Sequence, residues 1–278
     1  MPAYRYHLVN VFSEAPLSGL PIAVFDQPAL LDEASMQGLA QQIQTSVSVF
    51  LMPSARAHVR LAIFSPERPL RFSAAALLAA ATVLREQTGQ TLFSIETPTL
   101  IAPLWVEQEL WFYQVSSPGV RACEVRKRHL AAMLSLQESD IDEPALFIHG
   151  GIEQLVIPLT QAEAVRHCQP KLEDLSLHAV NEQGRPHLLV WYRSVDVVQA
   201  RSFGVRFGAL REEPASGAAI AALGGYLLHT RAPLPVSLRI RQGDHLERPA
   251  RLALQIDDNQ RILLGGQTRI QASGELHW

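Results

Sequence analysis

The residues best suited to chemistry lie where two carboxylates meet the start of an apolar helix. Glu212 and Glu213 precede a proline, and Ser216 then leads into an apolar segment over residues 220–228. The first turn of a helix has N–H groups without intrahelical partners and a partial positive charge, so it attracts anions. A purely structural helix start needs only one capping side chain. The additional acidic residues therefore indicate a ligand site.

Two interpretations of this stretch stay open. Glu212 and Glu213 are either an acid–base pair, in which mutual repulsion favours protonation of one carboxylate, or solvated loop carboxylates beside a helix N-terminus. Ser216, Gly217 and Ala218 either bind a carboxylate through backbone N–H groups or provide an N-cap only. We favour the anion site, because its geometry comes with the helix itself.

Composition restricts the class of protein. The 278-residue chain is 47% hydrophobic and 18% charged, which is typical of a globular protein of one or two domains. Its net charge of −3 gives no overall attraction for nucleic acid, and the short basic run 126–129 is interpreted as a solvated helix face. The longest apolar run, 74–84, is too short to span a bilayer, and the N-terminus does not have the pattern of a signal peptide. Two cysteines fit a reducing compartment. We expect a cytoplasmic protein that binds neither nucleic acid nor membrane.

The sequence contains no motif for a metal or a cofactor. Its ten histidines form no His-x-x-x-His arrangement, and Cys123 and Cys168 form no Cys-x-x-Cys. The glycine pairs 150–151 and 224–225 lack the surrounding pattern of a phosphate-binding loop. We therefore expect no metal site and no cofactor.

Two unusually apolar helices organise the chain. Ser73 and Ser216 are predicted N-caps of helices over residues 73–84 and 216–229, which begin about half a chain length apart. A helix that is apolar on all sides must be covered on all sides. Strands are predicted around the first helix at 4–12, 21–25, 47–52, 59–64, 92–96 and 104–106, and around the second at 110–115, 155–158, 188–192, 236–241 and 252–256. Amphipathic helices are predicted at 32–43 and 125–134.

This organisation predicts an α+β fold of the α/β roll type. It contains two similar domains, each a curled, mostly antiparallel sheet around a central apolar helix, related by a pseudo-twofold axis. Residues 1–116 form the N-terminal half, and a C-terminal strand at about 267–278 is a candidate to return to it. Residues 117–266 form the C-terminal half. If the halves pack face to face, both helix N-termini meet at their interface, a usual place for ligand pockets.

A series of short motifs in a fixed order carries a family resemblance. They are Asn10-Val11-Phe12, Gly19-Leu20-Pro21, Ser46-Val47-Ser48-Val49-Phe50, Phe64-Ser65-Pro66, Phe72-Ser73-Ala74-Ala75-Ala76, Glu96-Thr97, Glu212 to Ala219, and Gln242-Gly243 with Arg248-Pro249. In this order and spacing they resemble the phenazine-biosynthesis PhzF family of isomerases, whose fold is related to diaminopimelate epimerase. The resemblance covers essentially the whole chain and implies the two-domain fold described above.

The departures from the family pattern fall at the site that the resemblance implies. In the family, a glutamate in Ser-Glu-Ser moves a proton between substrate carbons, and Val47 stands there in this chain. Ala75 replaces the histidine of Gly-His-Pro, and Leu20 replaces the asparagine of Gly-Asn-Pro. Asn10 replaces an aspartate, and Glu213 replaces the aspartate before proline. Because valine can neither accept nor donate a proton, we predict an altered or absent proton shuttle.

The resemblance also implies which residues surround a bound substrate. These are Asn10, Leu20, Ser46, Val47, Ser48, Ala74, Ala75, Ser216, Gly217 and Ala218, with Glu213 as the remaining catalytic carboxylate. Strand alternation points Ser46 and Ser48 away from the face of Val47, which favours a structural role for both. We expect Leu20, Val47, Ala75, Glu213 and Ser216 to line one cavity between the domains. The two-cysteine mechanism of the related epimerases is excluded, since alanines and Ser216 occupy the two helix starts.

Three functions follow from these observations. The first is a PhzF-like protein with a degenerate active site that binds a small carboxylate metabolite. The second is an active, cofactor-free isomerase or lyase in a secondary-metabolite pathway that uses Glu213 as its acid or base. The third is a non-catalytic accessory protein, which uses the homodimer that is common in this family.

Overall fold

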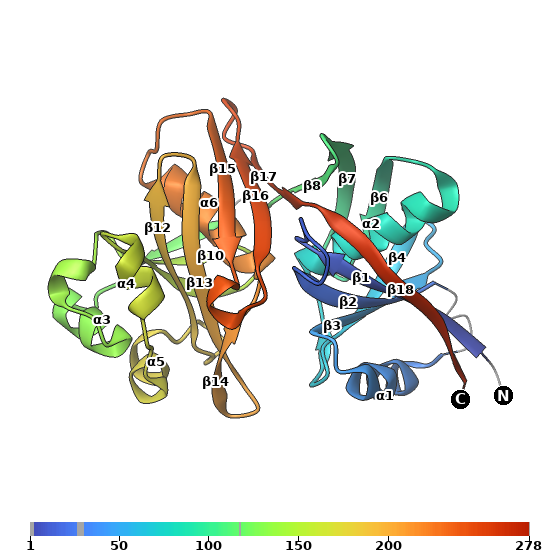
Figure 1. The fold of residues 1–278 in the computed structure, drawn as a ribbon, viewed down its shortest axis with the longest axis horizontal. Helices are drawn as coiled ribbons and strands as arrows, with labels where there is room; N and C mark the ends of the chain where they lie inside the picture. The colour runs from blue at the N-terminus through green and yellow to red at the C-terminus, as the bar shows by residue number, and fades with distance from the viewer. Residues whose placement is uncertain (1–2, 27–30, 117, 278) are drawn as a thin grey trace. The chain divides into compact units, whose positions relative to one another are not determined.

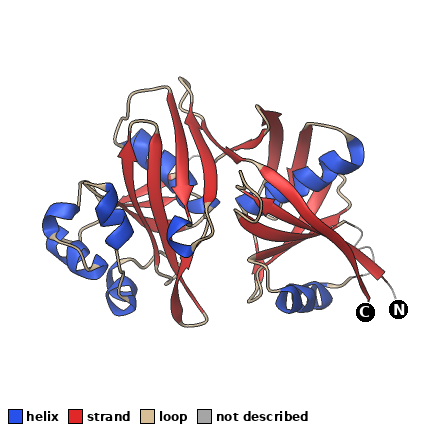
Figure 2. Cartoon of the chain, viewed as in Figure 1, coloured by secondary structure: helices blue, strands red, loops and turns tan. Residues whose placement is uncertain are grey.

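The computed structural model describes residues 3–26, 31–116 and 118–277. Its contacts divide the chain into two compact units (Figures 1 and 2). Unit 1 comprises Met1–Gln114 and Gly265–Trp278, and unit 2 comprises Val115–Leu264. Each unit is an α+β structure dominated by its sheet.

Unit 1 wraps its strands around one helix, α2. Its elements are β1 (Ala3–Val11), β2 (Leu20–Phe25), α1 (Glu33–Ile43), β3 (Val47–Met52), β4 (Val59–Phe64), β5 (Pro69–Leu70), α2 (Ala74–Thr88), β6 (Leu92–Glu96), β7 (Ile101–Glu107), β8 (Leu110–Gln114) and β18 (Thr268–His277). The strands pair in the order β18–β1–β2–β3–β4–β6–β7–β8, with parallel pairing at β2–β3 and β4–β6. The short α1 packs on the other face, against Phe25, Phe50 and Phe64.

Unit 2 has the same plan around α6. Its elements are β9 (Gly119–Ala122), α3 (Lys127–Leu134), η1 (Glu138–Asp140), β10 (Leu146–His149), β11 (Glu153–Pro158), α4 (Ala162–His167), α5 (Leu172–His178), β12 (His187–Ser194), β13 (Val197–Arg206), β14 (Ala209–Glu213), α6 (Gly217–His229), β15 (Val236–Gln242), η2 (Asp244–Leu246) and β16 (Ala250–Ile256). Strand β17 (Ile262–Gly266) crosses from unit 2 into unit 1 at Gly265. Strands β9 to β16 pair in the order β9–β10–β11–β12–β13–β15–β16, with parallel pairing at β11–β12 and β13–β15. Helices α3, α4 and α5 contribute to the core on the face away from α6, with Phe203.

The two units can be matched residue by residue through their strand registers. In each, a hairpin strand pairs with the end of the strand that precedes the central helix: β5 with β4, and β14 with β13. Aligning Phe64 of β4 with Phe203 of β13 also aligns their partners in β6 and β15. Thr97, directly after β6, then matches Gln242, the last residue of β15. This duplication confirms the predicted pair of similar sheets around apolar helices.

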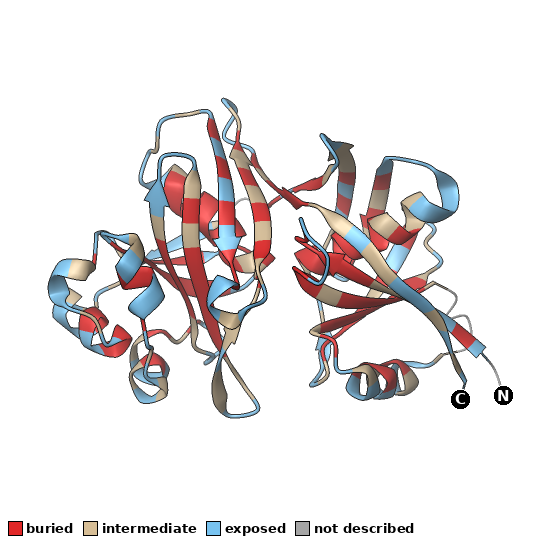
Figure 3. Cartoon of the chain, in the orientation of Figure 1, coloured by how far each residue is buried: buried red, intermediate tan, exposed pale blue. Residues whose placement is uncertain are grey.

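The central helices begin at the predicted serines. The Ser73 Oγ accepts a hydrogen bond from the N–H of Ala76 at 3.2 Å, and the Ser216 Oγ accepts one from Ala219 at 3.3 Å. Most residues of both helices are buried (Figure 3). The first helix runs past the predicted end to Thr88, because its last turn is polar and reaches the surface before Gly89 adopts a left-handed conformation.

Several elements escaped the sequence prediction. The prediction did not include strands β5, β9, β10, β13, β14 and β17 or helices α4 and α5, and β13 and β14 matter most for the candidate site. Buried polar residues such as Arg201 and Ser202 interrupt the apolar pattern of β13, so periodicity does not reveal it. Within the described residues, no helix is long and apolar enough to cross a membrane.

Candidate functional site

The candidate residues of unit 1 gather at one edge of its sheet. Asn10 at the end of β1 pairs with Pro21, and β2 and β3 begin side by side, with Ile22 opposite Val47. Strand β4 ends at the same edge, where Phe64 pairs with Ser48. The β5 hairpin then returns the chain to the start of α2. The fold therefore brings Leu20, Val47 and the first turn of α2 to one edge.

Asn10 is committed to the loop between β1 and β2. Its buried Nδ2 donates a hydrogen bond to the carbonyl oxygen of Ser18 at 2.8 Å. Gly19 follows with φ of 78°, and a Cβ there would lie 2.4 Å from the carbonyl oxygen of Val11. Only glycine fits so close an approach in this conformation. Asn10 thus holds the loop that places Leu20 at the edge.

Val47 and Ser48 lie on opposite faces of β3. Ser48 is fully buried, and its hydroxyl lies 3.3 Å from the Thr45 Oγ1. It shares its face with Phe50, which packs in the α1 cluster, so its surroundings are structural. Val47 is 7% exposed and points to the other face, while Ser46 is half-buried just before the strand. A carboxylate at position 47 would therefore point to the α2 side of the sheet.

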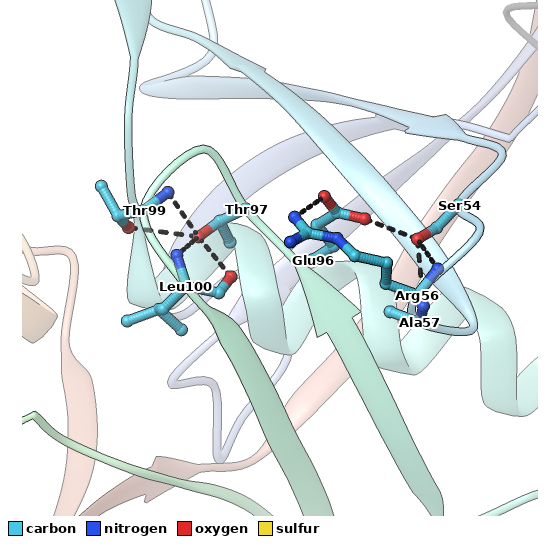
Figure 4. Close-up of polar contacts among 7 residues, drawn as sticks. All are labelled: Ser54, Arg56, Ala57, Glu96, Thr97, Thr99 and Leu100. Carbon is cyan, nitrogen blue, oxygen red and sulfur yellow. Dashed lines mark hydrogen bonds and ion pairs between the residues drawn. The ribbon is translucent and has the colours of Figure 1, made fainter.

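Glu96 is the last residue of β6, and Thr97 follows it directly (Figure 4). Glu96 pairs with Arg56 and accepts a hydrogen bond from Ser54. These hydrogen bonds, that from Arg56 first, lower the pKa of the Glu96 carboxyl. The Thr97 hydroxyl accepts from the N–H of Leu100 at 3.2 Å and donates to its carbonyl oxygen at 3.0 Å. Glu96 is thus bound to the turn at residues 54–57, and Thr97 holds the turn at residues 97–100.

Glu212 forms a buried ion pair in unit 2. Its Oε2 accepts from Arg201 Nη2 at 2.7 Å, and the two side chains are 7% and 9% exposed. Arg201 Nη1 also donates to the carbonyl oxygens of Val165 and Cys168, at 3.1 and 2.7 Å. The interpretation of Glu212 as a solvated loop carboxylate is therefore wrong, because Glu212 lies in β14 and its charge is paired.

Glu213 is the last residue of β14 and points the other way. It pairs in register with Ser202, whereas Glu212 pairs with Phe203 of the outer cluster. Neighbouring strand residues face opposite sides, so the two carboxylates do not form a mutual acid–base pair. Glu213 is half-buried, and its carboxylate has no hydrogen bond or ion pair within the described residues. It remains available to a ligand or a proton.

The start of α6 carries a set of unused hydrogen-bond donors. The N–H of Ser216 donates to Gln242 Oε1 at 2.9 Å, and the Ser216 Oγ caps Ala219. Among the described residues, the N–H groups of Gly217 and Ala218 have no partner. Gln242 is 1% exposed, and its buried Nε2 also has none. Because Oε1 must accept from Ser216, the orientation of the amide is fixed and Nε2 is a donor.

Gln242 is the candidate site residue that sequence reasoning missed. It stood in a recognised motif, Gln242-Gly243, but no role was assigned to it. The signal is the glycine: Gly243 has φ of 73°, and a Cβ there would lie 2.7 Å from the carbonyl oxygen of Pro214. That approach brings the end of β15 against the chain entering α6. A buried amide donor left unpaired costs about 1–3 kcal/mol, which a bound oxyanion would offset.

Neither cysteine is suited to nucleophilic chemistry. Burial raises the pKa of the Cys168 thiol to about 12 and also raises the pKa of Cys123. Within the described residues, no group of three or more His, Cys, Asp or Glu side chains could hold a metal ion. The groups described at the start of α6 suit anion binding, and the carboxylate of Glu213, unpaired within the described residues, suits proton transfer.

Known proteins resemble the chain over nearly its whole length. The model of the phenazine biosynthesis-like protein family, PhzC–PhzF, matches residues 9–274. An uncharacterized isomerase of Pasteurella multocida is 33% identical over 98% of this chain and 94% of its own. The trans-2,3-dihydro-3-hydroxyanthranilate isomerase of Pseudomonas aeruginosa is 26% identical over 90% and 89%. In fold, a PhzF family protein of Bacillus anthracis aligns over the whole of both chains with a TM-score of 0.87 at 18% identity. The chain therefore belongs to the PhzC–PhzF family of phenazine biosynthesis-like proteins.

Proposed function

We propose that this protein binds the carboxylate of a small metabolite at the start of α6. The observation that carries the proposal is the donor set formed by the N–H groups of Gly217 and Ala218 with the buried Nε2 of Gln242. These donors lie at the positive end of a 13-residue helix, where an oxyanion is favoured. Among the described residues, they have no protein partner.

We further propose that the proton shuttle of active relatives is altered or absent. The position of the family's glutamate is Val47, a buried side chain on the α2 face of β3. The neighbouring positions Leu20 and Ala75 are apolar and buried as well. A general acid or base contributes about 10²–10⁴-fold to a rate, so its loss leaves little turnover by the usual route. A bound carboxylate without turnover is the expected behaviour.

An active isomerase or lyase is the second candidate, and Glu213 favours it. Its carboxylate is half-buried, unpaired within the described residues, and on the α6 side of β14. A carboxylate so placed could exchange a proton with a ligand held at the helix start. The common cavity with Leu20, Val47 and Ala75, the homodimer and its accessory role, and the cytoplasmic location stay predictions.

Calorimetric titration with anthranilate, a stable aromatic carboxylate, tests the binding site. We expect Gln242→Leu to weaken binding about tenfold, the effect of losing one hydrogen bond to a charged group. Gln255→Leu on β16 is the matched control, because Gln255 lies on the less buried face of β16 and, among the described residues, makes no hydrogen bond to α6; it should bind as the wild type does. Equal affinity in all three proteins would exclude the donor set as the site.

Isotope exchange separates the two functions. The wild type is incubated in D₂O with trans-2,3-dihydro-3-hydroxyanthranilate, the compound named by its P. aeruginosa relative. We expect no enzyme-dependent deuterium at the ring carbons, whereas Val47→Glu combined with Ala75→His should introduce measurable exchange. Robust wild-type exchange that Glu213→Gln abolishes would instead establish Glu213 as the general base and overturn the non-catalytic function.

A further inference from the structure

Two polar side chains lie on the face of the unit 2 sheet that packs against α6. They are Gln154 of β11 and Ser202 of β13. The next residue of each strand, Leu155 or Phe203, lies in the core cluster on the face away from α6. Because successive side chains of a strand point to opposite faces, Gln154 and Ser202 point toward α6.

Both side chains are buried without a hydrogen-bond partner. Gln154 is 3% exposed and Ser202 is 4% exposed. Within the part of the chain that the structure describes, neither the amide of Gln154 nor the hydroxyl of Ser202 makes a hydrogen bond. Burying an amide or a hydroxyl without a partner destabilises a fold. The stability of unit 2 therefore does not explain why these two positions are polar.

Unit 1 shows that the sheet does not require polar residues at these positions. The alignment of the two units through their strand registers matches Gln154 with Ile22 and Ser202 with Ile63. Both isoleucines are buried against α2 in unit 1. The same fold is thus completed by aliphatic side chains, and the polar pair of unit 2 is best explained by a ligand.

Ser202 lies within the length of a small molecule from the start of α6. Gln242, which contacts that start through its amide, comes one residue after Arg241, the partner of Gln199 in β13. Ser202 is therefore two residues further along β13 than the position beside Gln242, a distance of roughly 7 Å. A ligand whose carboxylate is held at the helix start can reach the Ser202 hydroxyl.

Gln154 approaches the same helix start from the β10–β11 hairpin. It pairs with Ile148 across this hairpin. A Cβ on Gly150, in the turn of the hairpin, would lie 3.0 Å from the carbonyl oxygen of Ala218, so the hairpin packs directly against the first turn of α6. Gln154 and Ser202 thus both belong to the part of the sheet beside the proposed carboxylate site.

We propose that Gln154 and Ser202 select the ligand by binding a hydroxyl group of the metabolite whose carboxylate is held at the start of α6. This inference rests on the proposed carboxylate site. An amide and a hydroxyl can both donate and accept hydrogen bonds, as can a hydroxyl of the ligand. An acid without a hydroxyl leaves the two side chains unpaired when it binds, whereas a hydroxylated acid satisfies them.

Titration calorimetry of the full chain with benzoate and 3,5-dihydroxybenzoate tests this selection. The two acids share the carboxylate, and hydroxyls at both meta positions allow either orientation of the ring. We expect the wild type to bind the dihydroxy acid about fivefold more tightly, the effect of one hydrogen bond between neutral groups. Ser202→Ala and Gln154→Leu should each reduce this preference and leave the affinity for benzoate unchanged. Ser237→Ala and Gln255→Leu make the same substitutions on the other face of β15 and β16 and should retain it.

The Gln242→Leu variant separates this inference from the carboxylate site. It should weaken the binding of both acids equally and keep the preference between them. If it binds both acids as the wild type does, the carboxylate site is wrong. If the wild type binds both acids equally, or if Ser202→Ala and Gln154→Leu keep the full preference, the selection by these side chains is wrong. A wild type that binds neither acid would overturn both proposals.

Thermal denaturation without ligand distinguishes selection from a structural role. Because the two side chains have no hydrogen-bond partner among the described residues, Ser202→Ala and Gln154→Leu should unfold at a temperature no lower than that of the wild type. A lower unfolding temperature for both variants would show that these polar groups hold the fold together, and it would overturn the proposal.

Discussion

The two units present different chemistry at equivalent helix starts. Beside the start of α2, Val47 and Ala75 are apolar and buried. Thr97, which matches Gln242 of unit 2, uses its hydroxyl to bind the carbonyl oxygen of Leu100 in its own turn. Around α6 the matching position is Gln242, whose amide reaches the helix start, and Glu213 stands before it. The duplicated fold supplies two helix N-termini, and because the side chains around them differ, we expect only the start of α6 to hold a ligand.

The strands before the central helices differ in the same way. Aligning Phe64 with Phe203 matches Ala62 with Arg201, so the buried ion pair of unit 2 has an alanine at its place in unit 1. At this position unit 1 has an apolar side chain, Ala62, whereas unit 2 has the charged side chain of Arg201 paired with Glu212. The comparison predicts that unit 2 is the more sensitive to loss of a single partner.

The largest effect is expected from breaking that ion pair. Arg201→Met leaves the Glu212 carboxylate buried and unpaired, which costs about 3–5 kcal/mol of unfolding free energy. Combining it with Glu212→Leu should recover most of the loss, because no charge then stays buried. Urea denaturation followed by hydrogen exchange would locate the change in unit 2. A single variant as stable as the wild type would contradict the prediction.

Truncation in the central helices should affect both units alike. Leu78 of α2 and Leu223 of α6 are completely buried. Replacing either with alanine leaves a cavity and costs about 2–5 kcal/mol. The same denaturation measurement on each variant checks this. A loss in one unit only would show that the two cores are not equivalent.

A smaller, pH-dependent effect is expected at Glu153 of unit 2. Burial opposes ionisation, but hydrogen bonds from Arg121 at 3.1 Å and from the N–H of Glu182 outweigh it, so the pKa of Glu153 is lowered. A lowered pKa stabilises the fold above the unfolded value of about 4.3, and this contribution is lost as the pH falls through the folded value. Glu153→Gln should therefore lower stability by about 1–3 kcal/mol at pH 7.

At acid pH, the unfolding free energy of Glu153→Gln should equal that of the wild type. Unfolding free energies measured between pH 7 and pH 2 check this, because the two curves should converge as Glu153 becomes protonated. The register matches Glu153 with Pro21 in unit 1, so hydrogen exchange in unit 1 is the internal reference. Parallel curves across the whole range would show that the ion pair contributes nothing.

The smallest effect is expected from the two helix caps. Ser73→Ala and Ser216→Ala each remove one capping hydrogen bond, which costs about 1 kcal/mol. Thermal denaturation should show similar shifts for the two. Only Ser216→Ala should also weaken anthranilate binding, since it alone disturbs the start of α6. Weakened binding by Ser73→Ala would place the ligand at α2 instead.

The sequence predicted the layout better than the site. Strands β3, β4 and β6 begin and end at the predicted residues, because their apolar runs are short and bounded by turn residues. The central helices could be predicted because a helix that is apolar on all sides is stable only when it is buried on all sides. Strands β13 and β14 could not, since Arg201 and Glu212 are buried only by virtue of each other. This ion pair joins β13 to β14, so the sequence of neither strand alone reveals it.

The helix start at the candidate site could be predicted from the sequence, whereas the side-chain contacts around it could not. A helix start is a local feature, so Ser216 and its neighbours could be identified from the sequence. Gln242 reaches it from a strand that follows α6, and its contact with Ser216 depends on how β15 returns beside β13. Glu212 was grouped with Glu213 because they are adjacent, whereas the strand turns them to opposite faces.

The pairing of β18 with β1 has a consequence for synthesis on the ribosome. Residues 268–277 complete the edge of a strand that begins at Ala3, so unit 2 is an insertion within unit 1 along the chain. Because synthesis proceeds at roughly 5–20 residues per second, β18 emerges on the order of ten to fifty seconds after β1. Meanwhile the edge of β1 offers unpaired N–H and C=O groups to any other nascent strand. The last strand to emerge thus protects the first one, and the whole of unit 2 can be complete before unit 1 closes.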